Sequence, residues 1–472
     1  VVSTANLGEN EPVLANAAYV EEFARKNDNE EDEELDDEGT SSSSSSSEFE
    51  NTLVHYMKSY GYNKKRNWIN DNNNNDNQNN NDNNKKSNNN EERDGQRQRR
   101  RRELLTEMLS RYDYSTARGI LIPSIPGYYN INDHSTQHDD DDDEVMGQLK
   151  LRKAIQDYTP RTATEPRPVI CQFSSIGNVS EKYLHSLQTS MDMYLAHRSF
   201  SSSSSRSSIT TCQEKKKKRQ KKPQLQLKLV YPTVREICES VEGYRGGGTV
   251  PGREKNVGKF FLKDLWCKWS SSSSSNNSSA CTRSGRSNDD TADDTRHRHH
   301  GMNNNNNNNN KRHNPLAKPN NVPHIKSYYQ INGDENNENE ENAFDWLCIT
   351  SHNISQAAWG TIGDNSWGGG GKRLYIRSWE LGVFMSPQTL GVDKLIGWHE
   401  QQKRNRHSGG TKNDDPGPRT TVTTTSSTVP MPYNTHSLQP YNSSTDDDKP
   451  WAWDIRYYSG PPDRFGFHSM HG

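Results

Sequence analysis

The chain has 472 residues, enough for two or three domains, but hydrophobic residues make up only 28% of it, against roughly 45–50% in an ordinary globular domain. Much of the chain is therefore not core. The formal net charge of -3 hides acidic runs at 30–38 and 139–144 and basic runs at 97–102 and 215–222. Net charge thus excludes no class of partner, and the basic runs fit nuclear-import signals, DNA contacts or solvated loops alike.

Six low-complexity tracts account for the missing core residues. Such segments bury too little apolar surface to offset their ordering entropy, so we predict that they are flexible insertions. Insertions of this kind cost a packed domain little, because closure entropy grows only logarithmically with loop length. The tracts are 41–47, 70–90, 139–143, 199–208, 270–279 and 303–310.

Cysteine usage and hydropathy point to a soluble intracellular protein. The six cysteines form no Cys-x-x-Cys pair and no evident disulfide framework, which favours a reducing compartment. No apolar run approaches the ~20 residues of a membrane span, and no signal peptide opens the chain. Several histidines lie in polar tracts without Cys or carboxylate at ligand spacing, so we predict no metal site. They are His297, His299, His300, His468 and His471.

The predicted elements begin with a short amphipathic helix over 51–60, where Leu53, Val54 and Met57 follow helical spacing. A buried strand over 119–123 and a helix over 146–153 follow. Further strands are predicted at 169–173, 227–231, 324–329, 345–349, 374–377 and 380–385, and further helices at 233–241 and 354–359. Apolar strands that alternate with helices predict an α/β fold, with the sheet inside and the helices outside.

His324 and Lys326 are the most informative residues of the chain. If 323–329 is a strand, positions i and i+2 point to the same face, so an imidazole and an ammonium converge on one anion. That pairing suits phosphate chemistry. A lone His-x-Lys is usually an ordinary surface pair, so only the flanking sequence can distinguish a phosphate site from such a pair.

Two asparagines follow similar apolar stretches. Asn353 lies in Ser-His-Asn-Ile-Ser after Trp-Leu-Cys-Ile, and Asn6 lies in Ser-Thr-Ala-Asn-Leu after Val1-Val2. An asparagine after a strand is most often a turn former or helix N-cap. The repeated context favours a site role instead and predicts a duplicated fold. Its first His-x-Lys is expected upstream of Val1.

In order along the chain, these segments resemble the tyrosyl-DNA phosphodiesterases, a branch of the phospholipase D superfamily. One His-x-Lys would be weak evidence, but the ordered set is specific. The superfamily's usual Asp after the Lys is absent, which also fits this branch. The matching segments are 1–7, 168–177, 229–234, 242–251, 323–326, 350–360, 376–383 and 450–455.

The resemblance implies a phospholipase D-like α/β sandwich of two similar halves, each with a mixed sheet flanked by helices. Residues 1–144 are then the remainder of the N-terminal half, and 145–472 form the C-terminal half that carries His324 and Lys326. Both halves carry long insertions. The site is expected on the pseudo-twofold axis between them.

The resemblance also implies a reaction without metal or cofactor. One histidine attacks phosphorus to give a phosphohistidine, and the other, here His324, protonates the leaving group and later activates water. Lys326, Asn353 and Asn6 are expected to hold the non-bridging oxygens. Glu380 matches a carboxylate that orients the nucleophilic histidine, although an exposed strand glutamate would look the same.

Four further residues match substrate-binding positions. Ser174 and Ser175 resemble groups that hold the DNA backbone, whose contacts position the duplex without reading its sequence. Pro251 and Trp453 match positions near the groove for the peptide. The structural alternatives are a turn for the serines and core packing for Trp453.

The sequence therefore predicts a nuclear, monomeric tyrosyl-DNA phosphodiesterase of DNA repair. It would hydrolyse 3′-phosphotyrosyl (topoisomerase–DNA) linkages at single- or double-stranded 3′ ends. The alternatives are another phospholipase D superfamily phosphodiesterase or 3′-end nuclease, and a catalytically incomplete fragment that binds DNA ends. Because the nucleophile's motif is expected upstream, the chain by itself is not expected to turn over this substrate. Two departures from the family pattern are 8–10, after Asn6, and Gln356, where a Lys is common.

Overall fold

The computed structural model describes the residues that build the sheets and their covering helices. These are 2–3, 14–15, 18–26, 47–60, 100, 103–131, 145–198, 224–269, 321–332, 343–364, 371–397, 425–431, 433, 435, 438–442, 448–458, 460 and 462–468. Asn6 and, apart from Ser47, the six low-complexity tracts lie outside them. No helix within these ranges is long and apolar enough to cross a membrane.

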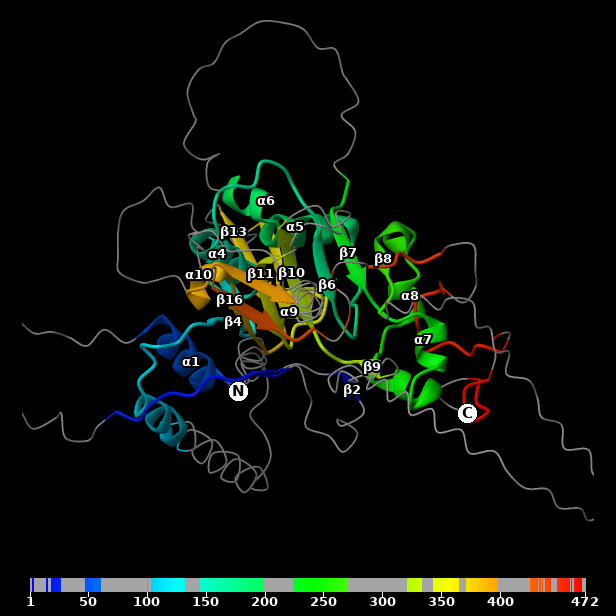
Figure 1. Ribbon diagram of the computed structural model, residues 1–472, viewed down its shortest axis with the longest axis horizontal. Coiled ribbons are helices and arrows are strands. Elements are labelled where there is room, and N and C mark those ends of the chain that lie inside the picture. The colour runs from blue at the N-terminus through cyan, green and yellow to red at the C-terminus, as the bar shows by residue number, and fades with distance from the viewer. Residues whose placement is uncertain are drawn as a thin grey trace, which may run out of the picture.

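One large mixed sheet forms the centre of the protein (Figure 1). β14 lies off the main row of strands and pairs with both β11 and β4. The pairs β6/β7, β7/β8 and β15/β16 are parallel, and the remaining pairs are antiparallel. The order is β16 (Ser426–Val429), β15 (Lys394–Gly397), β11 (Ala343–Thr350), β10 (Ser327–Asn332), β6 (Val169–Gln172), β7 (Leu227–Val230) and β8 (Trp266–Cys267), with β14 (Glu380–Met385) and β4 (Ile120–Ser124).

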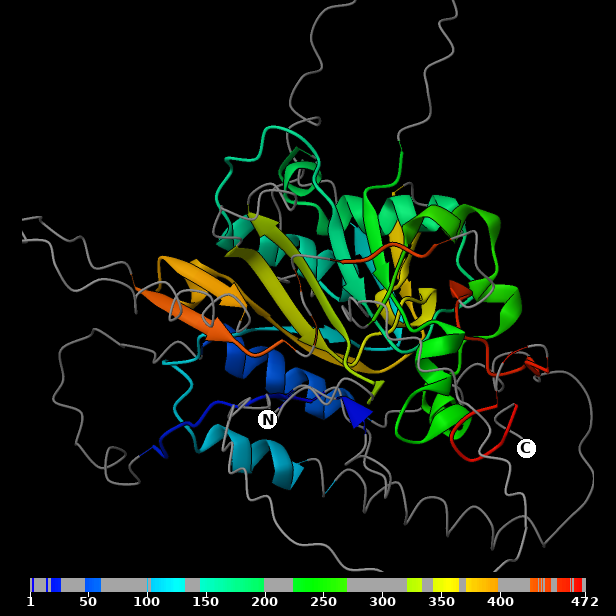
Figure 2. The ribbon, with the colours of Figure 1, turned by 45° about the vertical axis from the view of Figure 1, so that its right-hand side comes forward.

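Helices cover both faces of this sheet (Figure 2). α4 (Gly147–Tyr158), α5 (Glu181–Met191) and α6 (Met193–Arg198) pack together over one face. α1 (Glu48–Ser59) lies against the other face. There its Phe49 and Leu53 pack against a hydrophobic cluster that includes Leu347 and Ile349. The N-caps Ser47 and Ser180 accept backbone N–H bonds and so fix where α1 and α5 begin.

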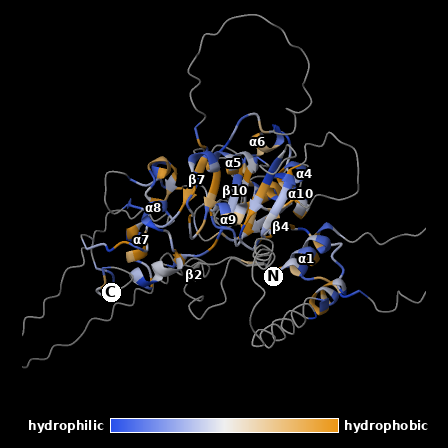
Figure 3. Cartoon of the chain, turned by 180° about the vertical axis from the view of Figure 1, so that it is seen from behind, coloured by the Kyte–Doolittle hydropathy of each residue, from blue (hydrophilic) through white to orange (hydrophobic). Residues whose placement is uncertain are grey.

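β11 shows why the central strands are mostly apolar. All eight of its residues are buried, because both faces of the sheet are covered. Trp346 and Cys348 contribute to one hydrophobic cluster, and Leu347 and Ile349 contribute to the other. Figure 3 shows the same concentration of hydrophobic residues along β7.

Smaller elements surround the sheet. β9 is the most important of them for the site, because the segment between β9 and the central strand β10 carries His324 and Lys326. The small strands are β1 (Val2–Ser3), β2 (Leu14–Ala15), β3 (Ala18–Tyr19), β5 (Gly127–Ile131), β9 (Val322–Pro323), β12 (Thr361–Asp364) and β13 (Lys372–Ile376). The short helices are α7 (Val234–Cys238), α8 (Glu254–Val257), α9 (Gln356–Trp359), α10 (Pro387–Leu390) and the 3₁₀ helices η3 (Gly243–Thr249) and η4 (Phe260–Leu265).

The predicted α/β class is confirmed, and the predicted strands and helices are found with shifted ends. One element was wrong: 324–329 is not one strand, because β9 ends at Pro323 and β10 begins only at Ser327. The predicted boundary between 1–144 and 145–472 stays a prediction. β4 precedes that boundary and yet pairs with β14 in the large sheet.

Candidate active site

Four strand ends bring the predicted residues to one end of the large sheet. Ser327, which begins β10, pairs with Gln172 at the end of β6 and with Ile349 near the end of β11. β14 runs antiparallel to β11, with Thr350 opposite Gly382, so its first residue lies at the same end. The segments after β6 and β11, before β10 and at the start of β14 therefore meet. They carry Ser174, Ser175, Asn353, His324, Lys326 and Glu380.

His324 and Lys326 are in contact although they are not in a strand. Both are almost fully buried, with 4% and 3% of their surface exposed. Lys326 Nζ donates to the His324 carbonyl at 2.7 Å and lies 3.2 Å from His324 Nε2. Nδ1 of the same ring lies 3.4 Å from Nζ. An ammonium has no acceptor, so the ring nitrogen that receives its hydrogen bond carries no proton in this contact. The predicted convergence of the two side chains is present, but a loop produces it.

Asn353 is held by the segment that carries the two serines. Its Oδ1 accepts the backbone N–H of Ser174 at 3.1 Å and of Ser175 at 2.9 Å, and the Ser174 hydroxyl at 3.3 Å. Two N–H donors require an oxygen at this position, which assigns the amide orientation. The Nδ2 group then lies on the side of the amide away from the serines.

A glycine lets these two segments approach. Gly177 donates its N–H to the Ile354 carbonyl at 2.9 Å. A Cβ on Gly177 would lie 2.9 Å from the Ser355 Cβ, closer than side chains tolerate. Ser355 in turn caps α9 by accepting the Ala358 N–H. The backbone on both sides of Asn353 is therefore fixed.

Glu380 joins the same end through Ser351. The Ser351 hydroxyl donates to Glu380 Oε2 at 2.6 Å and accepts the Leu381 N–H at 3.0 Å. Burial raises the pKa of Glu380 to about 7, although the Ser351 hydrogen bond and the charge of Lys326 both lower it. A carboxyl group with this pKa exchanges protons readily at neutral pH.

Pro251 and Trp453 come together elsewhere on this side. The backbone N–H of Trp453 donates to the carbonyl of Gly252 at 3.0 Å, and the Arg253 guanidinium lies 5.7 Å from the Trp453 ring centroid. Pro251 is exposed, whereas Trp453 is partly buried against the core. Their predicted role in substrate binding stays a prediction, as do the roles of the other site residues.

His352 was not predicted as a site residue. It lies between Ser351 and Asn353, is fully buried, and bonds through both ring nitrogens. One signal was present: the N-terminal segment has Ala5 immediately before Asn6, where this one has a histidine. Among the described residues, no group of three or more His, Cys, Asp or Glu side chains is placed to hold a metal ion.

A mixed sheet with a His-x-Lys pair at one end is consistent with the phospholipase D superfamily. The family model described as tyrosyl-DNA phosphodiesterase matches residues 95–442. The chain therefore belongs to the tyrosyl-DNA phosphodiesterase family.

Individual relatives bear the same name. Tyrosyl-DNA phosphodiesterase 1 of Arabidopsis thaliana is 26% identical over 361 residues, which cover 74% of this chain and 45% of the relative. A probable tyrosyl-DNA phosphodiesterase of Caenorhabditis elegans is 24% identical over 285 residues, 59% of this chain and 46% of the relative. The chain thus spans about half the length of these relatives. A yeast tyrosyl-DNA phosphodiesterase structure is 15% identical with a TM-score of 0.40, covering 86% of this chain and 65% of that one.

Proposed function

We propose that this chain supplies one half of the active site of a tyrosyl-DNA phosphodiesterase. The whole enzyme would hydrolyse the phosphodiester between a DNA 3′ end and a topoisomerase tyrosine, a step in DNA repair. One observation carries this proposal: His324 and Lys326 are buried in mutual contact at the sheet end that also holds Asn353 and Glu380. Membership in the family supports it.

The substrate phosphate is held by donors of two kinds. Lys326 contributes an ammonium, and Asn353 contributes the Nδ2 group that its contacts with the serines direct outward. Both stabilise the charge that develops on the non-bridging oxygens in the transition state. Burial strengthens the effect, because water screens these charges only weakly.

His324 serves as acid and then as base. In the first step an imidazole of the other half forms an N–P bond, the P–O bond to tyrosine breaks, and His324 gives a proton to the departing oxygen. In the second step His324 takes a proton from water. The water oxygen bonds to phosphorus, the N–P bond breaks, and the DNA leaves with a 3′-phosphate.

The Lys326 contact explains how His324 reaches the protonated state. Before substrate arrives, the ammonium lies against the ring nitrogen and favours the neutral imidazole. A bound phosphate accepts the hydrogen bonds of Lys326 and adds negative charge beside the ring. Both changes favour the imidazolium, which is the acid that the first step needs.

Glu380 orients the nucleophilic imidazole. Ser351 occupies its Oε2, so Oε1 is the oxygen assigned to the imidazole N–H. Burial raises the pKa of Glu380 to about 7. The carboxyl group can therefore share a proton with an imidazole, whose ordinary pKa of about 6.5 is close to it.

We also propose finer properties of the whole protein. The basic runs 97–102 and 215–222 support a nuclear location, and imaging of a fluorescent fusion with both runs neutralised tests it. We propose that the protein works as a monomer, that it acts on single- and double-stranded 3′ ends, and that it has nuclease activity at them. Light scattering and paired single- and double-stranded substrates test these points.

The central test uses the whole enzyme, in which residues 1–472 are joined to the half that supplies the nucleophilic imidazole, and an oligonucleotide with a 3′-phosphotyrosine in the presence of a chelator. We expect release of tyrosine without a divalent metal. With His324→Ala, a covalent protein–DNA species should accumulate on a denaturing gel, since a phenol of pKa about 10 leaves with modest acid assistance. A metal requirement, or a variant with neither slowed hydrolysis nor a trapped adduct, would overturn the proposal. DNA binding without any product would indicate an end-binding protein instead.

A further inference from the structure

His352 is a buried histidine directly before Asn353 that the reaction above does not use. None of its surface is exposed. Its ring stacks on the Trp359 indole, with centroids 4.1 Å apart and an interplanar angle of 25°. Its backbone N–H donates to Thr350 Oγ1 at 3.1 Å, and its carbonyl accepts the Tyr328 hydroxyl at 2.9 Å. The whole residue is therefore fixed.

Hydrogen bonding assigns the tautomer of this ring. The Ser124 hydroxyl donates its one proton to the Ala358 carbonyl at 2.6 Å. Ser124 Oγ can therefore only accept from His352 Nε2, which lies 2.8 Å away. Thr350 Oγ1 accepts the His352 N–H and donates to Nδ1, the closer of its acceptors, since the Leu381 carbonyl lies at 3.3 Å. The ring is a neutral imidazole with its proton on Nε2.

These bonds tie four elements to the segment that carries Asn353. Ser124 belongs to β4, Tyr328 to β10 and Thr350 to β11, and Trp359 belongs to α9. We propose that His352 is a positioning residue that fixes the backbone at Asn353, so that the Asn353 amide meets the substrate phosphate in one orientation. The inference rests on the proposed function, because the amide needs a phosphate to bind.

The surroundings exclude an acid–base or anion-binding role for His352. Burial lowers its pKa to about 3, so the ring stays neutral at working pH. Among its partners only Tyr328 titrates, and burial raises the pKa of that phenol well above its ordinary value. The corresponding residue of the N-terminal segment is Ala5. The imidazole is therefore an addition to this half of the duplicated pattern.

The test compares oligonucleotides that differ only at their 3′ end, one with a phosphate and one with a hydroxyl. For wild type we expect tighter binding of the 3′-phosphate by fluorescence anisotropy. His352→Ala should reduce that preference about tenfold, the size of one hydrogen bond to a charged group. Binding of the 3′-hydroxyl oligonucleotide should stay the same. His352→Gln should keep part of the preference, because its amide can still donate to Ser124.

The matched control is Gln330→Leu, which removes a buried side chain from the opposite end of the same sheet. Gln330 bonds to the Arg167 carbonyl, Asp192 and the Met193 N–H. The Gln330→Leu variant should have a lower melting temperature than wild type and should keep the 3′-phosphate preference. If Gln330→Leu loses the preference as His352→Ala does, or if His352→Ala keeps it, the positioning role is overturned.

A second readout separates this inference from the proposed function. The Ser174 and Ser175 N–H groups bond to Asn353 Oδ1, so hydrogen exchange reports the placement of Asn353 without any ligand. In His352→Ala these two amides should exchange at least about tenfold faster than in wild type, while in Gln330→Leu they should not. Unchanged exchange overturns the positioning role. A wild type that shows no preference for 3′-phosphate, yet shows this exchange pattern, overturns only the proposed function.

Discussion

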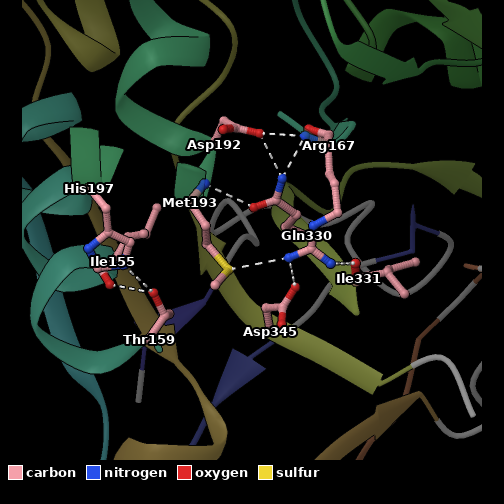
Figure 4. A network of polar contacts seen from close by, with 9 residues as sticks. All are labelled: Ile155, Thr159, Arg167, Asp192, Met193, His197, Gln330, Ile331 and Asp345. Atoms are coloured by element: carbon pink, nitrogen blue, oxygen red, sulfur yellow. Dashed lines mark hydrogen bonds and ion pairs between the residues drawn. The ribbon is translucent and has the colours of Figure 1, made fainter. Parts of the chain in front are cut away.

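Each end of the large sheet holds a basic side chain, and the two ends bond it differently. Lys326 is buried, whereas the Arg167 side chain is 25% exposed. At the end where β6 begins, Arg167 donates to the Asp345 carboxylate at 2.6 Å and to the Ile331 carbonyl at 2.8 Å (Figure 4). At the other end, Lys326 Nζ lies against the His324 carbonyl and a His324 ring nitrogen. The first set of contacts includes a full negative charge. These two Lys326 contacts are to neutral acceptors, and the Glu380 carboxyl group interacts with the same ammonium through space.

The difference separates a structural charge from a functional one. A carboxylate in direct contact neutralises a cation, and removing Arg167 would leave the buried Asp345 carboxylate unpaired. A neutral acceptor such as the His324 ring can give way to an arriving anion without leaving a buried carboxylate unpaired. We therefore propose that the Arg167 end mainly holds the fold together and that the Lys326 end is prepared for phosphate. Each prediction below challenges that assignment.

The largest effect is expected for Lys326→Met, which keeps the length of the side chain and removes its charge. Hydrolysis of a 3′-phosphotyrosyl oligonucleotide should fall about 10³-fold, the size of a lost transition-state donor. Thermal stability should be unchanged or higher, because burying a charge costs free energy. Single-turnover kinetics and calorimetry measure the two quantities. A large drop in melting temperature would assign Lys326 to the structural class.

Asn353→Asp should come next, with a loss of about 10²-fold in binding of a 3′-phosphate. The new carboxylate still accepts the N–H groups of Ser174 and Ser175, so the local fold is kept. The donor that faces the phosphate is replaced by a negative charge. Gln330→Leu is the control, because it removes a buried side chain from the opposite end of the sheet and should change binding little. Equal losses in the two variants would contradict the assigned amide orientation.

The opposite result is expected for Arg167→Met. It breaks the ion pair with Asp345, whose side chain is only 7% exposed, and should lower the free energy of unfolding by about 3 kcal/mol. The activity of the molecules that remain folded should match wild type. Denaturant titration and kinetics at a temperature well below the transition check both parts. The double variant with Asp345→Leu should recover much of the stability, since no buried charge is then left unpaired.

The sequence predicted the α/β class, most strands of the large sheet and the residues that gather at its end. It did so because the central strands are mostly apolar, and because Ser174, Ser175 and Asn353 follow them closely. It could not show that Asn353 bonds the backbone of Ser174 and Ser175, since that contact joins residues 178 and 179 positions apart. It also placed His324 in a strand, because a three-residue break between β9 and β10 leaves no trace in side-chain pattern.

His352 could not be predicted for a related reason. A histidine in a polar turn after a strand looks ordinary, and its partner Ser124 lies 228 positions away in the sequence. Only the pairing of β4 with β14 brings that hydroxyl to the ring. Long-range pairing of this kind decides which polar residues become buried.

The smallest effects are two opposing dependences of stability on pH at the site end. Burial lowers the pKa of His352 from 6.5 to about 3, so protonation favours the unfolded chain and stability falls as the pH drops from 6.5 towards 3. Burial raises the pKa of Glu380 from 4.5 to about 7, so ionisation favours the unfolded chain and stability falls as the pH rises from 4.5 to 7. In wild type the two contributions largely cancel between about pH 4.5 and pH 6.5, where both groups contribute.

Replacing either residue with glutamine, which does not titrate, should reveal the pH dependence of stability that the other residue causes. Between pH 7 and pH 5, Glu380→Gln should lose about 2 kcal/mol of unfolding free energy because His352 alone then titrates. His352→Gln should gain about 2 kcal/mol over the same interval, because Glu380 takes up its proton. Denaturant titrations at a series of pH values measure both slopes. Since every other group titrates equally in the two variants, the difference between their curves isolates this pair, and parallel curves would show that neither group is held as the structure places it.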